Sequence, residues 1–201
     1  LVEGFYTILD DVFALRDMDD AADGGKVKER YNGSGATVRG FNVEGRAAFT
    51  RWFELQAGVT LQQSRYKEPE FWSEDAEVPP VRRMFRTPDA YGYFTASFKP
   101  VRNFTADLSG TCTGSMLVQH MAGSGVAQDV AVSTPSFFDM NIRLSYDVRI
   151  YKEITMQLYG GVQNLFNAYQ KDFDKGVDRD SGYIYGPSLP RSWFVGAKFS
   201  F

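Results

Sequence analysis

Four aspartates recur at short intervals near the C-terminal end of the sequence: Asp172, Asp174, Asp178 and Asp180. Carboxylate oxygens spaced in this way can coordinate a calcium ion, so these four residues are candidate ligands. The EF-hand pattern is not matched, because Gly176 comes one position early and no glutamate closes the loop. Basic residues in the same stretch offset the charge, so a solvated surface loop is the alternative interpretation.

A second segment combines an aromatic ring with several guanidinium groups. Trp72 is followed, ten to fourteen positions later, by Arg82, Arg83 and Arg86. Arginine pairs with anions and stacks on rings, so such a loop suits an anionic metal chelate. We predict ligand contact at these four residues, and a merely solvated loop is the alternative. Acidic residues in the same stretch would cancel part of the attraction: Glu68, Glu70, Glu74, Asp75 and Glu77.

The sequence offers no set of residues that would make an enzyme. His120 is the only histidine, and Asp107 lies thirteen positions earlier on the same expected strand. An extended chain rises about 3.3 Å per residue, so roughly 40 Å would separate the two side chains. Cys112 is the only cysteine, which excludes an internal disulfide and a cysteine-based zinc site. The net charge of −3 lacks the basic excess of a nucleic-acid-binding protein.

Strict alternation of apolar and polar residues predicts long β-strands. From Phe138 to Ile150 every even position is apolar or aromatic, and from Asp139 to Tyr151 every odd position is polar. A soluble strand has about five or six residues, whereas a membrane-spanning strand needs about nine to eleven. Similar patterns predict eight antiparallel strands: Gly4–Arg16, Ala36–Thr50, Phe53–Gln62, Ala90–Lys99, Phe104–Gln119, Phe138–Tyr151, Ile154–Gln163 and Ser192–Phe201.

The connections between these strands alternate between short turns and long polar loops. Turns are expected at Arg51–Trp52, Pro100–Asn103 and Tyr151–Glu153, and loops at Asp17–Gly35, Glu68–Asp89, Met121–Pro135 and Gln170–Arg191. An outer-membrane β-barrel has short periplasmic turns and long extracellular loops. Aromatic residues near the expected strand ends would form its interfacial girdles: Tyr6, Trp52, Phe53, Tyr66, Tyr91, Tyr93, Tyr151, Tyr169, Trp193 and Phe201.

The run Gly161–Tyr169, which reads GVQNLFNAY, resembles the signature that precedes the last strand of TonB-dependent receptors. Gly186–Arg191 and the terminal Phe201 are similar to that family's closing segments, and Arg39–Glu44 resembles one of its earlier strands. The resemblance implies an all-β, antiparallel transmembrane β-barrel segment over residues 1–201. It would be the last eight of twenty-two strands, with the plug domain elsewhere.

The family resemblance also implies function and partners. Such a receptor lies in the bacterial outer membrane, in contact with its lipid. It imports a scarce nutrient, first an iron–siderophore complex and second cobalamin, with energy from the TonB complex through the plug. Phe201 would be read by the barrel-insertion machinery. We expect no cofactor other than the loop calcium considered above.

Two other interpretations fit the same strands. The first is a complete eight-stranded outer-membrane barrel with an adhesive or structural role, in which the first and last strands pair. The second is a soluble β-protein that binds a ligand, in which a second sheet covers the apolar face of residues 138–150. The sequence has no run of about eighteen apolar residues, and Leu1–Asp10 does not have the pattern of a signal peptide.

Overall fold

The structure is a computed structural model that describes residues 1–18, 27–187 and 189–201. The regular elements in these ranges are all strands, and every pair of neighbouring strands is antiparallel. No helix in the described ranges has both the length and the hydropathy that a membrane-spanning helix needs. The all-β, antiparallel prediction is therefore confirmed.

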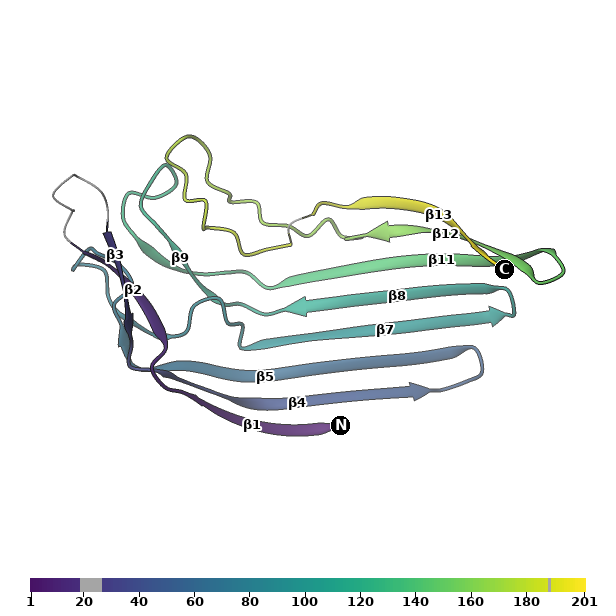
Figure 1. Cartoon of the computed structure of the whole chain (residues 1–201), viewed down its shortest axis with the longest axis horizontal. Helices are drawn as coiled ribbons and strands as arrows, with labels where there is room; N and C mark the ends of the chain where they lie inside the picture. The colour runs from purple at the N-terminus through teal and green to yellow at the C-terminus, as the bar shows by residue number, and fades with distance from the viewer. Residues whose placement is uncertain (19–26, 188) are drawn as a thin grey trace.

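Eight strands form one sheet in which each strand pairs with the next one along the chain (Figure 1). The short β6 (Val81–Arg83) adds to the sheet beside β5. The eight strands correspond one by one to the predicted strands. Their bounds are β1 (Val2–Leu9), β4 (Ala36–Ala48), β5 (Phe53–Glu70), β7 (Ala90–Val101), β8 (Phe104–Thr113), β11 (Phe137–Tyr151), β12 (Ile154–Gln163) and β13 (Ser192–Ser200).

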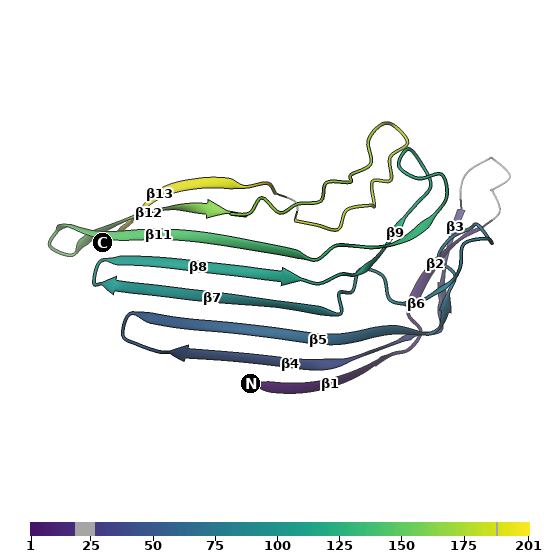
Figure 2. The ribbon, with the colours of Figure 1, turned by 180° about the vertical axis from the view of Figure 1, so that it is seen from behind.

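Short turns lie at one end of the sheet and long loops at the other (Figures 1 and 2). The C-terminus lies at the turn end, as the sequence pattern predicts. Two of the long loops contain hairpins of their own, which the sequence pattern did not reveal. They are β2 (Phe13–Met18) with β3 (Val27–Asn32), and β9 (Leu117–His120) with β10 (Val130–Ser133).

These hairpins shorten two of the predicted strands. The predicted strand Gly4–Arg16 ends at Leu9, and Asp11 adopts a positive φ of 52° before β2 begins. Aspartate tolerates this left-handed conformation, which interrupts a strand. The predicted strand Phe104–Gln119 divides at Gly114, where glycine weakens the ladder. Residues 19–26 of the predicted loop Asp17–Gly35, and Ser188, lie outside the described residues.

The pairing register gathers apolar side chains on one face of the sheet and polar side chains on the other. Residues directly opposite each other on neighbouring strands point to the same face. Ile142 lies opposite Val162 on β12 and Leu108 on β8. Arg143 lies opposite Asp107 on β8. The same alternation runs from β1 to β13, so over most of the sheet one face is mainly apolar and the other mainly polar.

The apolar face is not covered by protein. Phe41 is 66% exposed, Leu144 is 44% exposed and Val195 is 89% exposed. Figure 2 shows the sheet from behind, with no second layer across either face. A water-soluble protein rarely leaves so large an apolar surface open. The second sheet that the soluble interpretation requires is absent from the described residues. Few hydrophobic residues in the described part of the chain are buried: Ala36, Ala96, Val118, Val162 and Tyr183.

The sheet does not close on itself. Its order runs from β1 to β13, and the described residues show no pairing between these two strands. The interpretation as a complete eight-stranded barrel requires that pairing, so the structure contradicts it. Two open edges would invite pairing with further strands.

The polar face carries tyrosines assigned to the interfacial girdle: Tyr66, Tyr91 and Tyr93. Tyr66 is five residues from Leu61 on β5, so it lies on the opposite face from that apolar residue. Tyr93 lies opposite Gly58 and Thr111, and its hydroxyl accepts a hydrogen bond from Gln56 at 3.3 Å. Tyr91 shares this face because it is two residues away on the same strand. A residue near a strand end meets the lipid interface only if the parity of its position places it on the apolar face, so the girdle prediction is wrong for these three residues.

Candidate functional site

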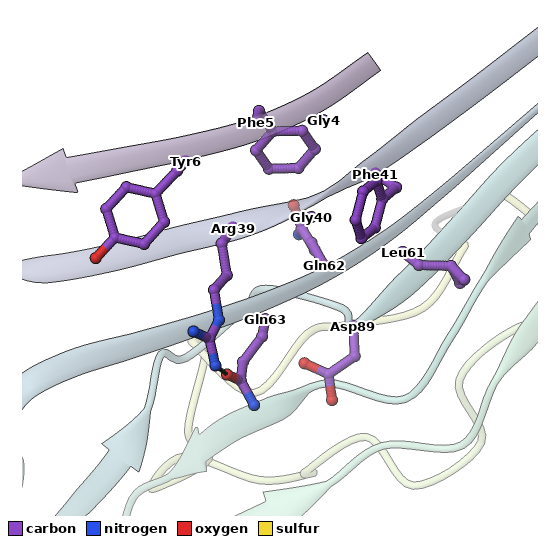
Figure 3. A pocket seen from close by; sticks show the side chains of 10 residues that line it. All are labelled: Gly4, Phe5, Tyr6, Arg39, Gly40, Phe41, Leu61, Gln62, Gln63 and Asp89. Carbon is purple, nitrogen blue, oxygen red and sulfur yellow. Dashed lines mark hydrogen bonds between the residues drawn. The ribbon is translucent and has the colours of Figure 1, made fainter. Parts of the chain in front are cut away.

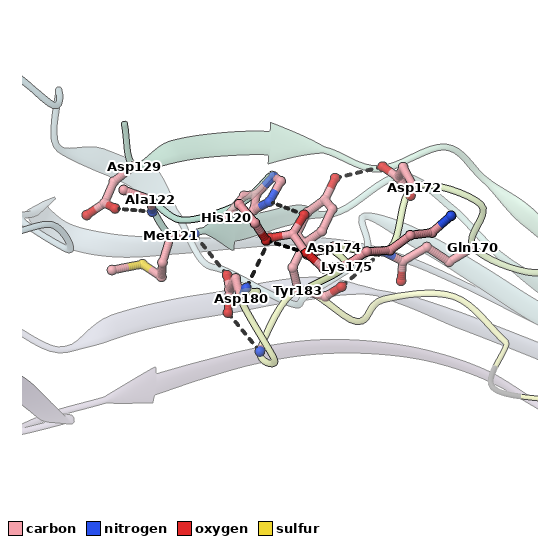
Figure 4. A network of polar contacts seen from close by, with 12 residues as sticks. His120, Met121, Ala122, Asp129, Gln170, Asp172, Asp174, Lys175, Asp180 and Tyr183 are labelled. Atoms are coloured by element: carbon pink, nitrogen blue, oxygen red, sulfur yellow. Dashed lines mark hydrogen bonds and ion pairs between the residues drawn. The ribbon is translucent and has the colours of Figure 1, made fainter. Parts of the chain in front are cut away.

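A partly buried polar cluster joins two of the long loops at the loop end of the sheet (Figure 4). We call it the loop clasp. His120 comes from the end of β9, and the other members come from the loop between β12 and β13. The loop clasp consists of His120, Gln170, Asp172, Asp174, Tyr183 and Tyr185.

His120 connects the two loops by stacking and by a hydrogen bond. Its residue is only 6% exposed, and its ring lies parallel to that of Tyr183 with the centroids 3.7 Å apart. Its Nε2 lies 3.0 Å from Oδ1 of Asp174, whose other oxygen accepts the Asp180 N–H at 3.0 Å. The bond from the Asp180 N–H, together with the His120 contact, holds the pKa of Asp174 below its ordinary value against the opposing effect of burial.

Asp172 accepts two tyrosine hydroxyls, from Tyr183 at 2.8 Å and from Tyr185 at 2.6 Å. Burial acts to raise the pKa of Asp172, but the hydrogen bonds from Tyr185 and Tyr183 outweigh it and lower that pKa. Burial, and then the bond to Asp172, raise the pKa of Tyr183 to about 12 and also raise the pKa of Tyr185. Gln170 completes the cluster, because its side chain donates to the Tyr183 carbonyl and accepts from the Tyr185 N–H.

Three of the four predicted calcium ligands, Asp172, Asp174 and Asp180, accept hydrogen bonds within the loops through their carboxylates. Asp172 and Asp174 belong to the loop clasp, and Asp180 accepts the N–H groups of Met121 and Gly182 at 2.8 Å each. Across the described ranges, no group of three or more histidine, cysteine or acidic side chains is arranged to hold a metal ion. The calcium site at Asp172, Asp174, Asp178 and Asp180 stays a prediction.

The three predicted arginines do not meet at one point. Arg86 donates to the carbonyls of Ile184, at 2.8 Å, and Gly182, so it ties its own loop to the one that follows β12. Arg83 donates to the Ser115 carbonyl and pairs with Asp89. Arg82 donates to the Lys67 carbonyl at 2.9 Å and lies 3.6 Å from a Glu68 oxygen.

The strand register separates Arg82 from Arg83. Arg65 and Leu61 are four residues apart on β5, so both lie on the apolar face. Arg83 lies opposite Arg65 and therefore shares this face. Neighbouring residues of a strand point to opposite faces, so Arg82 lies on the polar face. The predicted ligand contacts at Trp72, Arg82, Arg83 and Arg86 stay predictions, but Arg83 lies on the other side of the sheet from Arg82.

Trp72 lies at a hollow of about 310 Å³ beside the outer part of β5. Its ring meets that of Phe85 edge to face, with the centroids 5.3 Å apart. The indole Nε1 is buried and has no hydrogen-bond partner within the part of the chain that the structure describes. Tyr66 and Glu70 also line the hollow, and neither was predicted as a site residue. An unpaired donor beside aromatic rings suits a ligand that carries both oxygen acceptors and rings.

Comparison with solved structures shows the fold. The ferric-catecholate import receptor Fiu of Escherichia coli K12, in its closed form, has a TM-score of 0.63 and 19% identity, over 98% of this chain and 24% of that one. A mutant of the ferric enterobactin receptor PfeA of Pseudomonas aeruginosa has a TM-score of 0.64 and 15% identity, over 98% of this chain and 28% of that one.

A second PfeA mutant, solved in complex with enterobactin, has a TM-score of 0.63 and 14% identity, over 98% and 28% of the two chains. The chain thus spans about a quarter of the length of the solved receptors that it matches. No family model and no curated protein matches the sequence. The chain has the fold of a barrel section of such siderophore receptors, as the family resemblance of its sequence predicts.

Proposed function

We propose that this chain is the C-terminal section of an outer-membrane β-barrel receptor that imports a ferric siderophore with energy from the TonB complex. One observation carries the proposal. A single sheet presents an uncovered apolar face and a continuous polar face, and all its long loops extend from one end. An apolar outside and a wet inside are what a barrel in a membrane requires.

The open edges of the sheet support the view that further strands complete the barrel. Every backbone polar group inside a bilayer needs a partner, so neither β1 nor β13 can face lipid with an unpaired edge. In this proposal, strands from the rest of the protein pair with both edges. The plug that contacts TonB also belongs to the rest of the protein, and Phe201 is the residue read by the insertion machinery.

The proposed substrate is an anionic chelate that carries aromatic rings. Trp72 lines a hollow and carries an indole N–H that is unpaired among the described residues, and Arg82, which lies 3.6 Å from a Glu68 oxygen, is on the polar face. Guanidinium groups and indole rings both favour anionic aromatic ligands. Arg86 also ties its own loop to the loop that follows β12, because its guanidinium donates to two carbonyls there.

Uptake by cells that express the whole receptor tests this function. Deletion of its gene should abolish uptake of iron-labelled ferric enterobactin and growth on that chelate as the sole iron source. Complementation with Trp72→Ala should restore it at about tenfold weaker affinity or worse, because buried aromatic contacts dominate binding. Val177→Ala, a change at a fully exposed loop side chain, serves as the matched control. Unchanged iron uptake in the deletion strain, or loss of cobalamin uptake alone, would overturn the proposal.

A further inference from the structure

The outward face of the sheet changes from apolar to basic near the loop end of β4 and β5 (Figure 3). Phe41 and Leu61 lie opposite each other and close the apolar part of this face. Two residues further toward the loops, on the same face, Arg39 lies opposite Gln63. Two residues beyond Gln63 on β5 is Arg65, which lies opposite Arg83 on β6.

This change occurs at the height where a membrane's hydrocarbon layer ends. Phe53 and Leu61 are eight residues apart on β5, which at about 3.4 Å per residue and a tilt of about 40° corresponds to a height of about 21 Å. On the same scale Gln63 and Arg39 lie at about 26 Å and Arg65 at about 31 Å. The apolar band of an outer-membrane barrel is about 25 Å tall, so these arginines lie at the level of the lipid headgroups.

Two adjoining hollows lie at this level. The larger, of about 620 Å³, is bordered by Tyr6, Arg39, Phe41 and Leu61. The smaller, of about 260 Å³, is bordered by Arg65 and Arg83, and the two hollows share Gln62, Gln63 and Asp89. An apolar recess beside a basic one matches a molecule with a hydrocarbon part and an anionic part.

The guanidinium groups here have little negative charge to neutralise them. Arg39 donates to Gln63 at 2.8 Å, and within the described ranges neither Arg39 nor Arg65 has an ion-pair partner. Arg83 pairs with Asp89 at 2.9 Å, and its Nε is buried with no acceptor among the residues that the structure describes. Like charges directly opposite each other on neighbouring strands repel, as Arg65 and Arg83 must. Three guanidinium groups thus border one carboxylate, and an added anion would relieve the repulsion.

We propose that Arg39, Arg65 and Arg83 form a site for the phosphate of an anionic membrane lipid, whose acyl chains run down the apolar face along Phe41 and Leu61. This proposal rests on the proposed location of the barrel in a membrane. The bidentate geometry of guanidinium suits phosphate oxygens, and Tyr6 lies opposite Arg39 where a ring is favoured at the headgroup level. Bound lipid would fix the outer part of β5, from which the Trp72 loop extends.

The test compares lipid binding in vesicles of phosphatidylcholine with and without phosphatidylglycerol. The complete receptor is inserted into these vesicles and then extracted with detergent. The lipids that it retains are counted by native mass spectrometry. Each Arg→Gln change at Arg39 or Arg65 should lower the preference for phosphatidylglycerol about fivefold, the equivalent of about 1 kcal/mol per basic residue near a membrane surface. Asp89→Asn should raise that preference instead, because it removes the competing carboxylate.

Controls separate the outcomes. Lys175→Gln removes the same charge from an exposed loop position and should leave the preference unchanged. If inorganic phosphate displaces the lipid, the anion that binds this site is free phosphate and not a lipid headgroup, which overturns the proposal. If Lys175→Gln lowers the preference for phosphatidylglycerol as much as Arg39→Gln or Arg65→Gln does, the arginines do not form a specific site. A wild type that inserts into both vesicles without preference refutes the lipid site alone. A wild type that inserts into neither vesicle refutes the membrane function on which the site depends.

Discussion

Replacement of Tyr183 by phenylalanine removes the phenol hydroxyl from the loop clasp and leaves the ring in place. The hydroxyl donates to the Asp172 carboxylate at 2.8 Å, while the ring stays buried against His120. A hydrogen bond to a charged group contributes about 1.5–3 kcal/mol. Asp172 keeps the bond from Tyr185, and its residue is exposed, so water can replace part of the loss. We therefore expect the low end of that range, about 1.5 kcal/mol, or roughly tenfold more frequent loop opening.

Limited digestion with trypsin measures that opening, because Lys175 and Arg179 lie in the loop that the clasp holds. When opening and closing are fast, the nicking rate follows the population of the open form. Tyr183→Phe should therefore be nicked about ten times faster than the wild type, with unchanged gel mobility of the unboiled barrel. Tyr169→Phe is the matched control, since its hydroxyl has no hydrogen-bond partner among the described residues. Equal nicking of the two variants would refute the role assigned to the Asp172 contact.

Three further predictions concern pH and the two faces. The pKa of Tyr183 is raised to about 12, so its neutral hydroxyl stabilises the clasp fully below about pH 10, and this contribution is lost as the pH rises through 12. Nicking of the loop should therefore accelerate only between these two pH values. Acceleration already at neutral pH would contradict this prediction. Gly58→Val should cost about 1–3 kcal/mol in urea unfolding, because a Cβ there would lie 2.7 Å from the Tyr93 ring, and Tyr93→Ala should relieve it. Leu144→Arg should cost about 2–4 kcal/mol in the same assay, and a cost below about 0.5 kcal/mol would place Leu144 away from lipid.

The long strands could be predicted from the sequence because each face meets a different solvent. In β11, fourteen consecutive positions from Phe138 alternate, so both the length and the orientation of the strand follow from the residue types. The alternation of short and long connections follows from the same pattern. The prediction of eight strands rests on this alternation alone, and it depends neither on a buried core nor on the family resemblance.

The loops could not be predicted in the same way, because their contacts join distant residues. His120 and Asp174 are fifty-four positions apart, and the sequence offered only Asp107, on the same strand, as a partner for the histidine. The hairpins β2–β3 and β9–β10 have strands of only six and four residues, too short for a clear period. The predicted arginine cluster separated because residue type says nothing about the face that each arginine occupies.

Adjacent positions on β8 provide the most direct test of which face meets lipid. Cys112 is the only cysteine, is exposed, and lies opposite Phe138 on the apolar face, whereas Thr111 lies opposite Tyr93 on the polar face at nearly the same depth. A thiol reacts with a charged, membrane-impermeant maleimide only in water, where its thiolate forms. In vesicle-inserted protein Cys112 should stay unlabelled, and the thiol of Thr111→Cys in a Cys112→Ser background should be labelled. The reverse pattern, or rapid labelling of Cys112 in the vesicles, would contradict the account.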